Sequence, residues 1–269
     1  MTPGEPTATA PENIKQCCAR IYESDAAKLL LGESFHPGGL ALTERLGILL
    51  GLNPKSRVLD VASGKGTSAI YLAERFGCEV VGIDYSEQNV KEATEATAAK
   101  GLASRVRFEQ ADAERLPAGD GSFDGVICEC AFCTFPDKSS AAREFARVLR
   151  QGGSVGLSDL TRGTDLPKEL DGLLAWVACI ADAQPLERYA VYLNDAGLRV
   201  SQTEAHDRAL TEMVHQVRMK LLSMEIMTGL KKIELPDLDL AAAKTMAQSA
   251  LEAIKQGKLG YAIVCGVKV

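Results

Sequence analysis

The stretch from Arg57 to Gly66, with the sequence RVLDVASGKG, constrains the fold more than any other part of the chain. Its first half is an apolar run, and its second half is a turn that contains two glycines. An apolar run before a glycine turn is typical of a strand buried on both faces of a parallel sheet. Glycines also let a ligand approach the main chain closely. Residues 67–76 follow with helical spacing, so the stretch predicts a nucleotide pocket at the carboxyl edge of a sheet.

The glycine loop by itself leaves two kinds of nucleotide site open. Residues 64–69, GKGTSA, also fit the dinucleotide-binding pattern that ends in alanine. Asp84 lies where that pattern places an acid that binds the ribose of a dinucleotide. The loop therefore predicts a nucleotide-like ligand. Whether this ligand is a dinucleotide has to be judged from the sequence of the strands that follow.

Four further strands are predicted after this loop. Residues 79–84 (EVVGID) end in an aspartate, and residues 106–113 (VRFEQADA) carry Asp112 near their end. Two more strands are predicted at 123–128 and 152–159, with helices between the strands. Such alternation predicts an α/β fold with a doubly wound, mostly parallel sheet.

This series of strands and acids resembles the class I S-adenosylmethionine-dependent methyltransferases over residues 35–200. The resemblance implies a Rossmann-like fold, S-adenosyl-L-methionine as cofactor, and a methyl-transfer activity. A Rossmann-like domain that binds no ligand is the alternative that the sequence leaves open.

The resemblance also implies tasks for the residues at the strand ends. The loop backbone closes over the methionine part of the cofactor, and Asp60 orients this loop or reaches the amino group through water. Asp84 accepts hydrogen bonds from the ribose hydroxyls, and Asp112 faces the adenine amine. Ala62 stands where many relatives carry the first glycine of the loop. The expected cofactor site comprises Asp60, Ala62, Ser63, Gly64, Gly66, Asp84, Tyr85, Asp112, Ala113 and Cys128. For Asp84 and Asp112 the alternative is a structural role, as a turn residue or a helix cap.

Residues 1–50 are expected to form a loose tail and a helical cap over the carboxyl edge of the sheet. Residues 51–269 are expected to form the methyltransferase domain, with a helical insertion at about 208–257 before the last strand. The methionine-rich helix predicted at 210–231 is expected to pack in the core or to form the face of a homodimer.

The chain has 269 residues and a net charge of −6, without a basic cluster, so nucleic acid is not expected as a partner. No apolar run approaches the ~20 residues of a membrane span. Residues 1–11 lack the apolar centre of a signal peptide. A cytoplasmic location is therefore expected, and the eight cysteines do not predict a disulfide framework there.

The segment after the fourth predicted strand, 127–138 (ICECAFCTFPDK), contains three cysteines and no histidine that could act as a general base. Thiolates are soft ligands, so this cluster indicates a soft acceptor atom rather than oxygen or nitrogen. The acceptor is therefore expected to be a small molecule or a metalloid, with a thiol reductant as a further partner.

This segment also looks like the equivalent stretch of the arsenite methyltransferases, with Cys130 on the family's cysteine. Residues 176–183 (WVACIADA) are similar to a second segment of that family, which places Cys179 on another arsenic-binding cysteine. The resemblance implies that cysteine thiolates hold arsenite or methylarsenite while the arsenic lone pair attacks the sulfonium methyl. The work of such an enzyme is mostly positioning.

The family also has a cysteine shortly before the first strand, and no cysteine lies near Ser34 and Phe35 in this chain. A third thiolate is expected from the N-terminal helix, from Cys17 or Cys18, with Cys133 as the chief rival. The expected acceptor residues are Cys130, Cys179, Cys18, Cys17 and Cys133.

Other interpretations of the acceptor side remain open. The chain could methylate a small organic acceptor, with its cysteines merely structural, or a thiol, selenium, tellurium or mercury. It could be a non-catalytic module that binds a metalloid or the cofactor. Cys128, Cys130, Cys133 and Cys179 could also bind zinc, although the one-residue gap between the first two is unusual for structural zinc.

Overall fold

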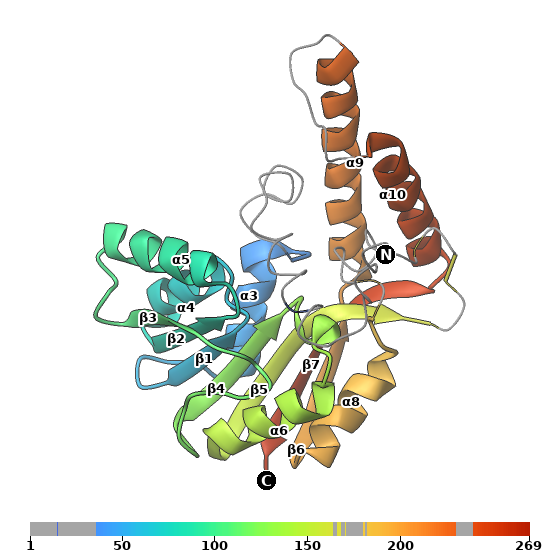
Figure 1. Cartoon of the computed structure of the whole chain (residues 1–269). Coiled ribbons are helices and arrows are strands. Elements are labelled where there is room, and N and C mark those ends of the chain that lie inside the picture. Colours follow the sequence, from blue (N-terminus) through green and yellow to red (C-terminus); the bar gives the residue numbers. More distant parts are fainter. Residues whose placement is uncertain are drawn as a thin grey trace, which may run out of the picture.

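The computed structural model describes residues 15, 36–163, 166, 167, 170, 180, 182–229 and 239–269. Within this part of the chain, a seven-stranded sheet with the order β3-β2-β1-β4-β5-β7-β6 forms the centre of the molecule (Figure 1). The strands are β1 (Arg57–Val61), β2 (Glu79–Asp84), β3 (Val106–Gln110), β4 (Phe123–Glu129), β5 (Leu149–Arg162), β6 (Leu198–Ala205) and β7 (Leu259–Lys268). Strands β1 to β5 pair in parallel, and β7 runs antiparallel to both of its neighbours. The predicted α/β, doubly wound, mostly parallel fold is confirmed.

Helices cover both faces of this sheet. One face carries α3, α4 and α5, and the other carries α6 and α8 (Figure 1). The helices are α3 (Gly39–Leu49), α4 (Thr67–Phe76), α5 (Glu87–Ala99), the 3₁₀ turn η1 (Phe132–Thr134), α6 (Lys138–Val148), α8 (Leu186–Asp195), α9 (Asp207–Gly229) and α10 (Leu240–Lys255). The short strands β1 and β2 are almost wholly buried between these layers, as their apolar sequences require.

The register of the strands brings their carboxyl ends together at one edge. Val61 at the end of β1 pairs with Ile83 of β2 and with Cys128 of β4. Asp84 pairs with Gln110, the last residue of β3. The loops that follow β1, β2, β3 and β4 therefore lie close together, at the edge of the sheet where the sequence predicts a ligand pocket.

Helix α3 occupies a different place from the expected cap over this edge. Its Leu46 is buried, and a Cβ built on Gly156 of β5 would lie 2.8 Å from the Leu46 side chain. A Cβ on Gly47 would lie 2.4 Å from Phe76 of α4. Helix α3 therefore belongs to the layer on one face of the sheet, because its apolar residues pack there. The earlier part of the expected cap lies outside the described residues, except for residue 15, and the domain boundary at residue 50 stays a prediction.

The expected helical insertion corresponds to α9 and α10, which lie between β6 and β7 in sequence and rise away from the sheet (Figure 1). The two helices pack on each other through Leu221, Met224, Ala243 and Ala247. Met224 thus lies in a small core, whereas Met219 is 63% exposed, so the methionine-rich helix is only in part a core element. Among the described helices, none has both the length and the apolar character needed to span a membrane.

Candidate cofactor and acceptor pocket

A pocket opens at the carboxyl edge of the sheet, where β1 and β4 lie side by side. The connections after these two strands run to opposite sides of the sheet, and ligands of doubly wound folds bind at such a point. The pocket is lined by the segments that follow β1, β2, β3 and β4, together with Lys15 and His36. Every expected cofactor residue lines it except Gly66 and Cys128.

Asp84, at the end of β2, holds the glycine loop and the start of α5 together. Its Oδ2 accepts a hydrogen bond from the Gly64 N–H at 2.8 Å. Its Oδ1 accepts from the Ser86 N–H at 2.9 Å and from Asn89 Nδ2 at 3.2 Å. A carboxylate offers about four lone-pair sites, so Asp84 can also accept from a ligand hydroxyl in the pocket. The structural role and the expected ribose-binding role are therefore compatible.

The backbone of the loop turns through left-handed conformations, with φ of +59° at Ala62, +53° at Gly64 and +76° at Gly66. A Cβ on Gly66 would lie 2.4 Å from the ring of Phe108. Gly66 therefore serves packing and the start of α4, which explains why it does not line the pocket. Ala62 adopts the same left-handed region at a cost, since a side chain there meets the backbone. Strain of this kind is typical of ligand-binding loops.

Asp60 and Ser63 present polar atoms that lack hydrogen-bond partners within the described part of the chain. Asp60 is 2% exposed, and its Oδ2 has no partner there. The Ser63 Oγ is also buried without a partner. Burial raises the pKa of Asp60 well above its ordinary value, and the charges of Glu129 and Asp84 raise it further. The amino group of S-adenosylmethionine would supply both a donor and a positive charge to such a site, so these residues fit the expected cofactor.

The expected adenine end of the pocket contains an ion pair. Lys15 Nζ lies 2.7 Å from Asp112 Oδ2 and 2.5 Å from Glu114 Oε2. Tyr85 and Ala113 line the same end of the pocket. The contact of Asp112 with adenine stays a prediction, and any ligand amine that binds there has to share the carboxylate with Lys15.

Glu129, the last residue of β4, is a pocket residue that the sequence analysis did not identify. Its Oε2 accepts a hydrogen bond from Ser68 Oγ at 2.5 Å and from Thr43 Oγ1 at 3.1 Å. His36 Nε2 lies 3.6 Å from the same oxygen, and the Glu129 side chain is 4% exposed. The signal that could have found it is its position, because an acid at the end of β4 follows the same pattern as Asp84 at the end of β2.

The structure separates the cysteines that were expected to act together. Cys130 is half-buried on the pocket wall, with a left-handed backbone of φ +52°. Cys128 and Cys133 are fully buried in the core and do not line the pocket. Burial raises the pKa of the Cys128 thiol well above its ordinary value, which disfavours a thiolate. The expectation that Cys128 contacts the cofactor is therefore corrected, because its side chain packs between the sheet and the helices on its face. Cys17, Cys18 and Cys179 lie outside the described residues.

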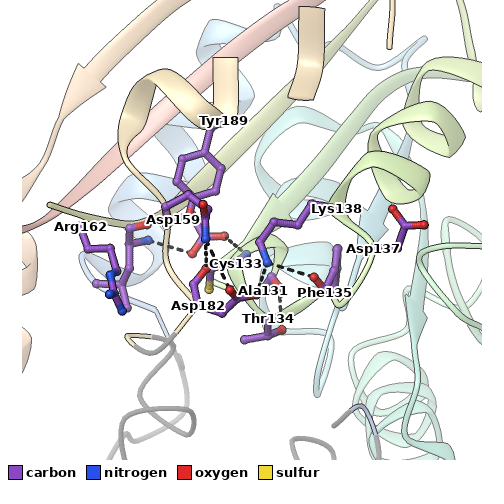
Figure 2. Close-up of polar contacts among 12 residues, drawn as sticks. Ala131, Cys133, Thr134, Phe135, Asp137, Lys138, Asp159, Arg162, Asp182 and Tyr189 are labelled. Carbon is purple, nitrogen blue, oxygen red and sulfur yellow. Dashed lines mark hydrogen bonds and ion pairs between the residues drawn. The ribbon is translucent and has the colours of Figure 1, made fainter. Parts of the chain in front are cut away.

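Figure 2 shows how the segment after β4 is fixed to its surroundings. The Cys133 N–H donates to Asp159 Oδ2 of β5 at 2.8 Å. Lys138 Nζ donates to the Phe135 carbonyl at 3.0 Å and forms an ion pair with Asp182. These contacts hold the pocket wall on its acceptor side. Among the described residues no group of three or more histidine, cysteine or acidic side chains could hold a metal ion, so this part of the chain gives no support to zinc.

Comparison with known proteins gives the chain's relatives. The family described as "Methyltransferase domain" matches residues 58–153. Methyltransferase GfsG of Streptomyces halstedii is 33% identical over 67% of this chain, and the chain spans 63% of that relative's length. The 27-O-demethylrifamycin SV methyltransferase of Amycolatopsis mediterranei is 31% identical over 67% of this chain and 72% of its own length.

A solved structure has the same fold. The phosphoethanolamine N-methyltransferase 2 of Haemonchus contortus, in complex with phosphomonomethylethanolamine and S-adenosylhomocysteine, superposes with a TM-score of 0.74 at 20% sequence identity. The superposition covers 97% of this chain and 58% of that one. None of these named relatives is described as an arsenite enzyme.

Proposed function

Because the chain belongs to the class I S-adenosylmethionine-dependent methyltransferases, we propose that it transfers the methyl group of this cofactor to a small organic acceptor at the end of β4. One observation carries the proposal: a single pocket joins the expected cofactor residues to the acceptor side, from Asp84 through Asp60 to Cys130. A ligand at the first group of residues therefore has a continuous path to the second.

When bound, S-adenosylmethionine supplies an electrophilic methyl group on a sulfonium. The residues of this chain then have separate tasks. Asp84 accepts hydrogen bonds from the ribose while it holds the Gly64 N–H in place. Asp60 receives the amino group at its Oδ2, which has no hydrogen-bond partner among the residues that the structure describes. The segment from Cys130 to Phe135 shapes the wall against which the acceptor rests, and positioning of this kind accounts for much of the rate of a transfer reaction.

An organic acceptor is favoured over arsenic by the placement of the thiols. Trivalent arsenic prefers several thiolates, and in the described part of the chain Cys130 is the one cysteine that lines the pocket. The name of the 27-O-demethylrifamycin SV methyltransferase points to an oxygen acceptor, and that of the phosphoethanolamine N-methyltransferase gives a nitrogen acceptor. A hydroxyl or an amine therefore matches both the pocket and the family.

Arsenic is the second candidate, and Cys130 is the observation that favours it, since its thiol lies on the pocket wall at the methyl-accepting end. This candidate needs Cys179, and Cys17 or Cys18, to approach Cys130. These thiolates would then position the arsenic, whereas an organic acceptor is positioned by the pocket wall alone.

A mass-spectrometric assay distinguishes the two candidates. The protein is incubated with S-adenosylmethionine and, in separate reactions, arsenite, methylarsenite, a small thiol, sarcosine or phosphoethanolamine, and the methylated product is identified. Methylation of an amine or hydroxyl compound that survives in Cys130→Ser supports the organic acceptor. Methylation of arsenite that Cys130→Ser abolishes, and that the buried control Cys133→Ser retains, supports arsenic and overturns the organic proposal.

A further inference from the structure

The Glu129 carboxyl group is held in a fixed orientation in the pocket. Strand β4 pairs with β1, with Cys128 opposite Val61, so the next residue, Glu129, lies beside the start of the glycine loop. Two hydroxyl donors, Ser68 and Thr43, hold its carboxylate from two different helices. Hydroxyl donors of this kind fix the direction in which a carboxyl group points.

A second carboxylate lies close enough to sense the charge of Glu129. Asp60 pairs in register with Ile127, two residues before Glu129, and the charge of Glu129 contributes to the raised pKa of Asp60. The Asp60 Oδ2 is buried and has no hydrogen-bond partner among the described residues. A buried, unsatisfied carboxylate oxygen is costly, so this end of the pocket is suited to a cation.

Three basic side chains line the described pocket, and two of them are paired elsewhere. Lys15 forms an ion pair with Asp112 at the expected adenine end, and Lys65 with Glu92 at 2.8 Å. The third, His36, lies near Glu129, with its Nε2 at 3.6 Å from Oε2, and this nitrogen makes no hydrogen bond to any residue that the structure describes. None of the three is hydrogen-bonded to Asp60 Oδ2, which has no partner in the described part of the chain.

We infer that Glu129 forms a subsite that selects the positively charged sulfonium of S-adenosylmethionine over the neutral thioether of S-adenosylhomocysteine, beside Asp60, which takes the amino group that both ligands carry. This inference rests on the proposed function. Glu129 lies at the end of β4, between the loop that takes the amino-acid part of the cofactor and the acceptor wall at Cys130. Methyl transfer removes one positive charge from the ligand, so the attraction weakens once the reaction is complete and release of the product is favoured.

The test is calorimetric titration of the whole chain with S-adenosylmethionine, S-adenosylhomocysteine and sinefungin, which carries an amine in place of the sulfonium methyl. Glu129→Gln should weaken the binding of S-adenosylmethionine about tenfold and that of S-adenosylhomocysteine less than about threefold. The affinity for sinefungin should fall by about the same factor as the affinity for S-adenosylmethionine. The matched control is Glu109→Gln, the same change at an exposed position on β3 outside this pocket, and it should leave all three affinities unchanged.

Equal weakening of all three ligands by Glu129→Gln would overturn the inference, because it would show a structural role for the side chain. An unchanged ratio of the dissociation constants of S-adenosylmethionine and S-adenosylhomocysteine would overturn it as well. Thr43→Val, which removes one hydroxyl donor from the Glu129 carboxylate, is the second variant should Glu129→Gln fail to fold, and it should shift the ratio of the two affinities in the same direction. Wild-type protein that binds none of the three ligands would instead refute the proposed function itself, which separates the two failures.

Discussion

The two sides of the pocket are built in different ways. On the cofactor side, Asp84 takes its donors from residues 2, 5 and 20 positions away in sequence. On the side formed by β4 and the segment after it, which includes the acceptor wall, Glu129 takes its donors from residues 61 and 86 positions away, and Cys133 is held by Asp159 at a separation of 26. The loop around Asp84 is therefore a product of local chemistry, whereas the side formed by β4 and the segment after it exists only when distant parts of the chain have packed together.

The largest effect expected on the cofactor side comes from Asp84→Ala. The change removes the acceptor expected for the ribose and releases the Gly64 N–H from its place in the loop. Charge-assisted hydrogen bonds contribute about 1.5–3 kcal/mol, so affinity for S-adenosylhomocysteine should fall about 10- to 100-fold. Calorimetry measures this, and an unchanged affinity would contradict the assigned role.

The same change on the acceptor side, Asp159→Ala, should have a different consequence. It leaves the N–H groups of Cys133 and Leu160 without their acceptor, and the free energy of unfolding should fall by about 2 kcal/mol. Denaturant unfolding measures the loss. Affinity for the cofactor should stay within about threefold of wild type. An affinity loss as large as that of Asp84→Ala would show that the two sides are not separate.

The pH dependence of stability gives a third comparison, through Asp60. Its folded-state pKa is raised, first by burial and then by Glu129 and Asp84. The stability that accompanies the protonated form is therefore fully present below the ordinary pKa of 3.8 and is lost as the pH rises through the folded-state value. Asp60→Asn stays neutral, so it should melt at a higher temperature than wild type at neutral and alkaline pH. The two proteins should converge below that ordinary pKa, and a melting difference that does not change with pH would contradict this account.

The smallest effect is expected from Ala62→Gly in the glycine loop. Ala62 has a φ of +59°, where glycine is unstrained, but glycine also gains more entropy on unfolding. The net result should be a gain of about 0.5 kcal/mol in the free energy of unfolding. The control is Ala69→Gly, a buried position in α4 that should lose about 1 kcal/mol. A loss in both variants would show that the left-handed turn is not strained.

This contrast explains what the sequence could predict. The apolar run 57–61, the glycine loop and Asp84 carry their signals within about thirty consecutive residues, and the fold places them at the expected edge of the sheet, although Gly66 serves packing and does not line the pocket. The position of Glu129 at the end of β4 could have indicated it, but its donors Thr43 and Ser68 could not be predicted, because only the packing of α3 and α4 against the sheet brings them to it.

The cysteines illustrate the same limit. Cys128, Cys130 and Cys133 are close in sequence, yet the left-handed backbone at Cys130 and the turn η1 direct only one of them to the pocket. Spacing alone could not predict this, because in a strand followed by a turn the direction of each side chain depends on the local backbone angles. The expected partnership with Cys179 and with Cys17 or Cys18 stays a prediction.

The central claim is that the pocket between β1 and β4 binds S-adenosylmethionine rather than a dinucleotide. Competitive calorimetry with S-adenosylmethionine and NAD tests it most directly, since the glycine loop alone is compatible with either ligand. The account predicts that S-adenosylmethionine binds with a dissociation constant of about 1 µM to 1 mM, the usual range for enzyme ligands, and that NAD at saturating concentration does not displace it. Tight binding of NAD that excludes S-adenosylmethionine would contradict the account.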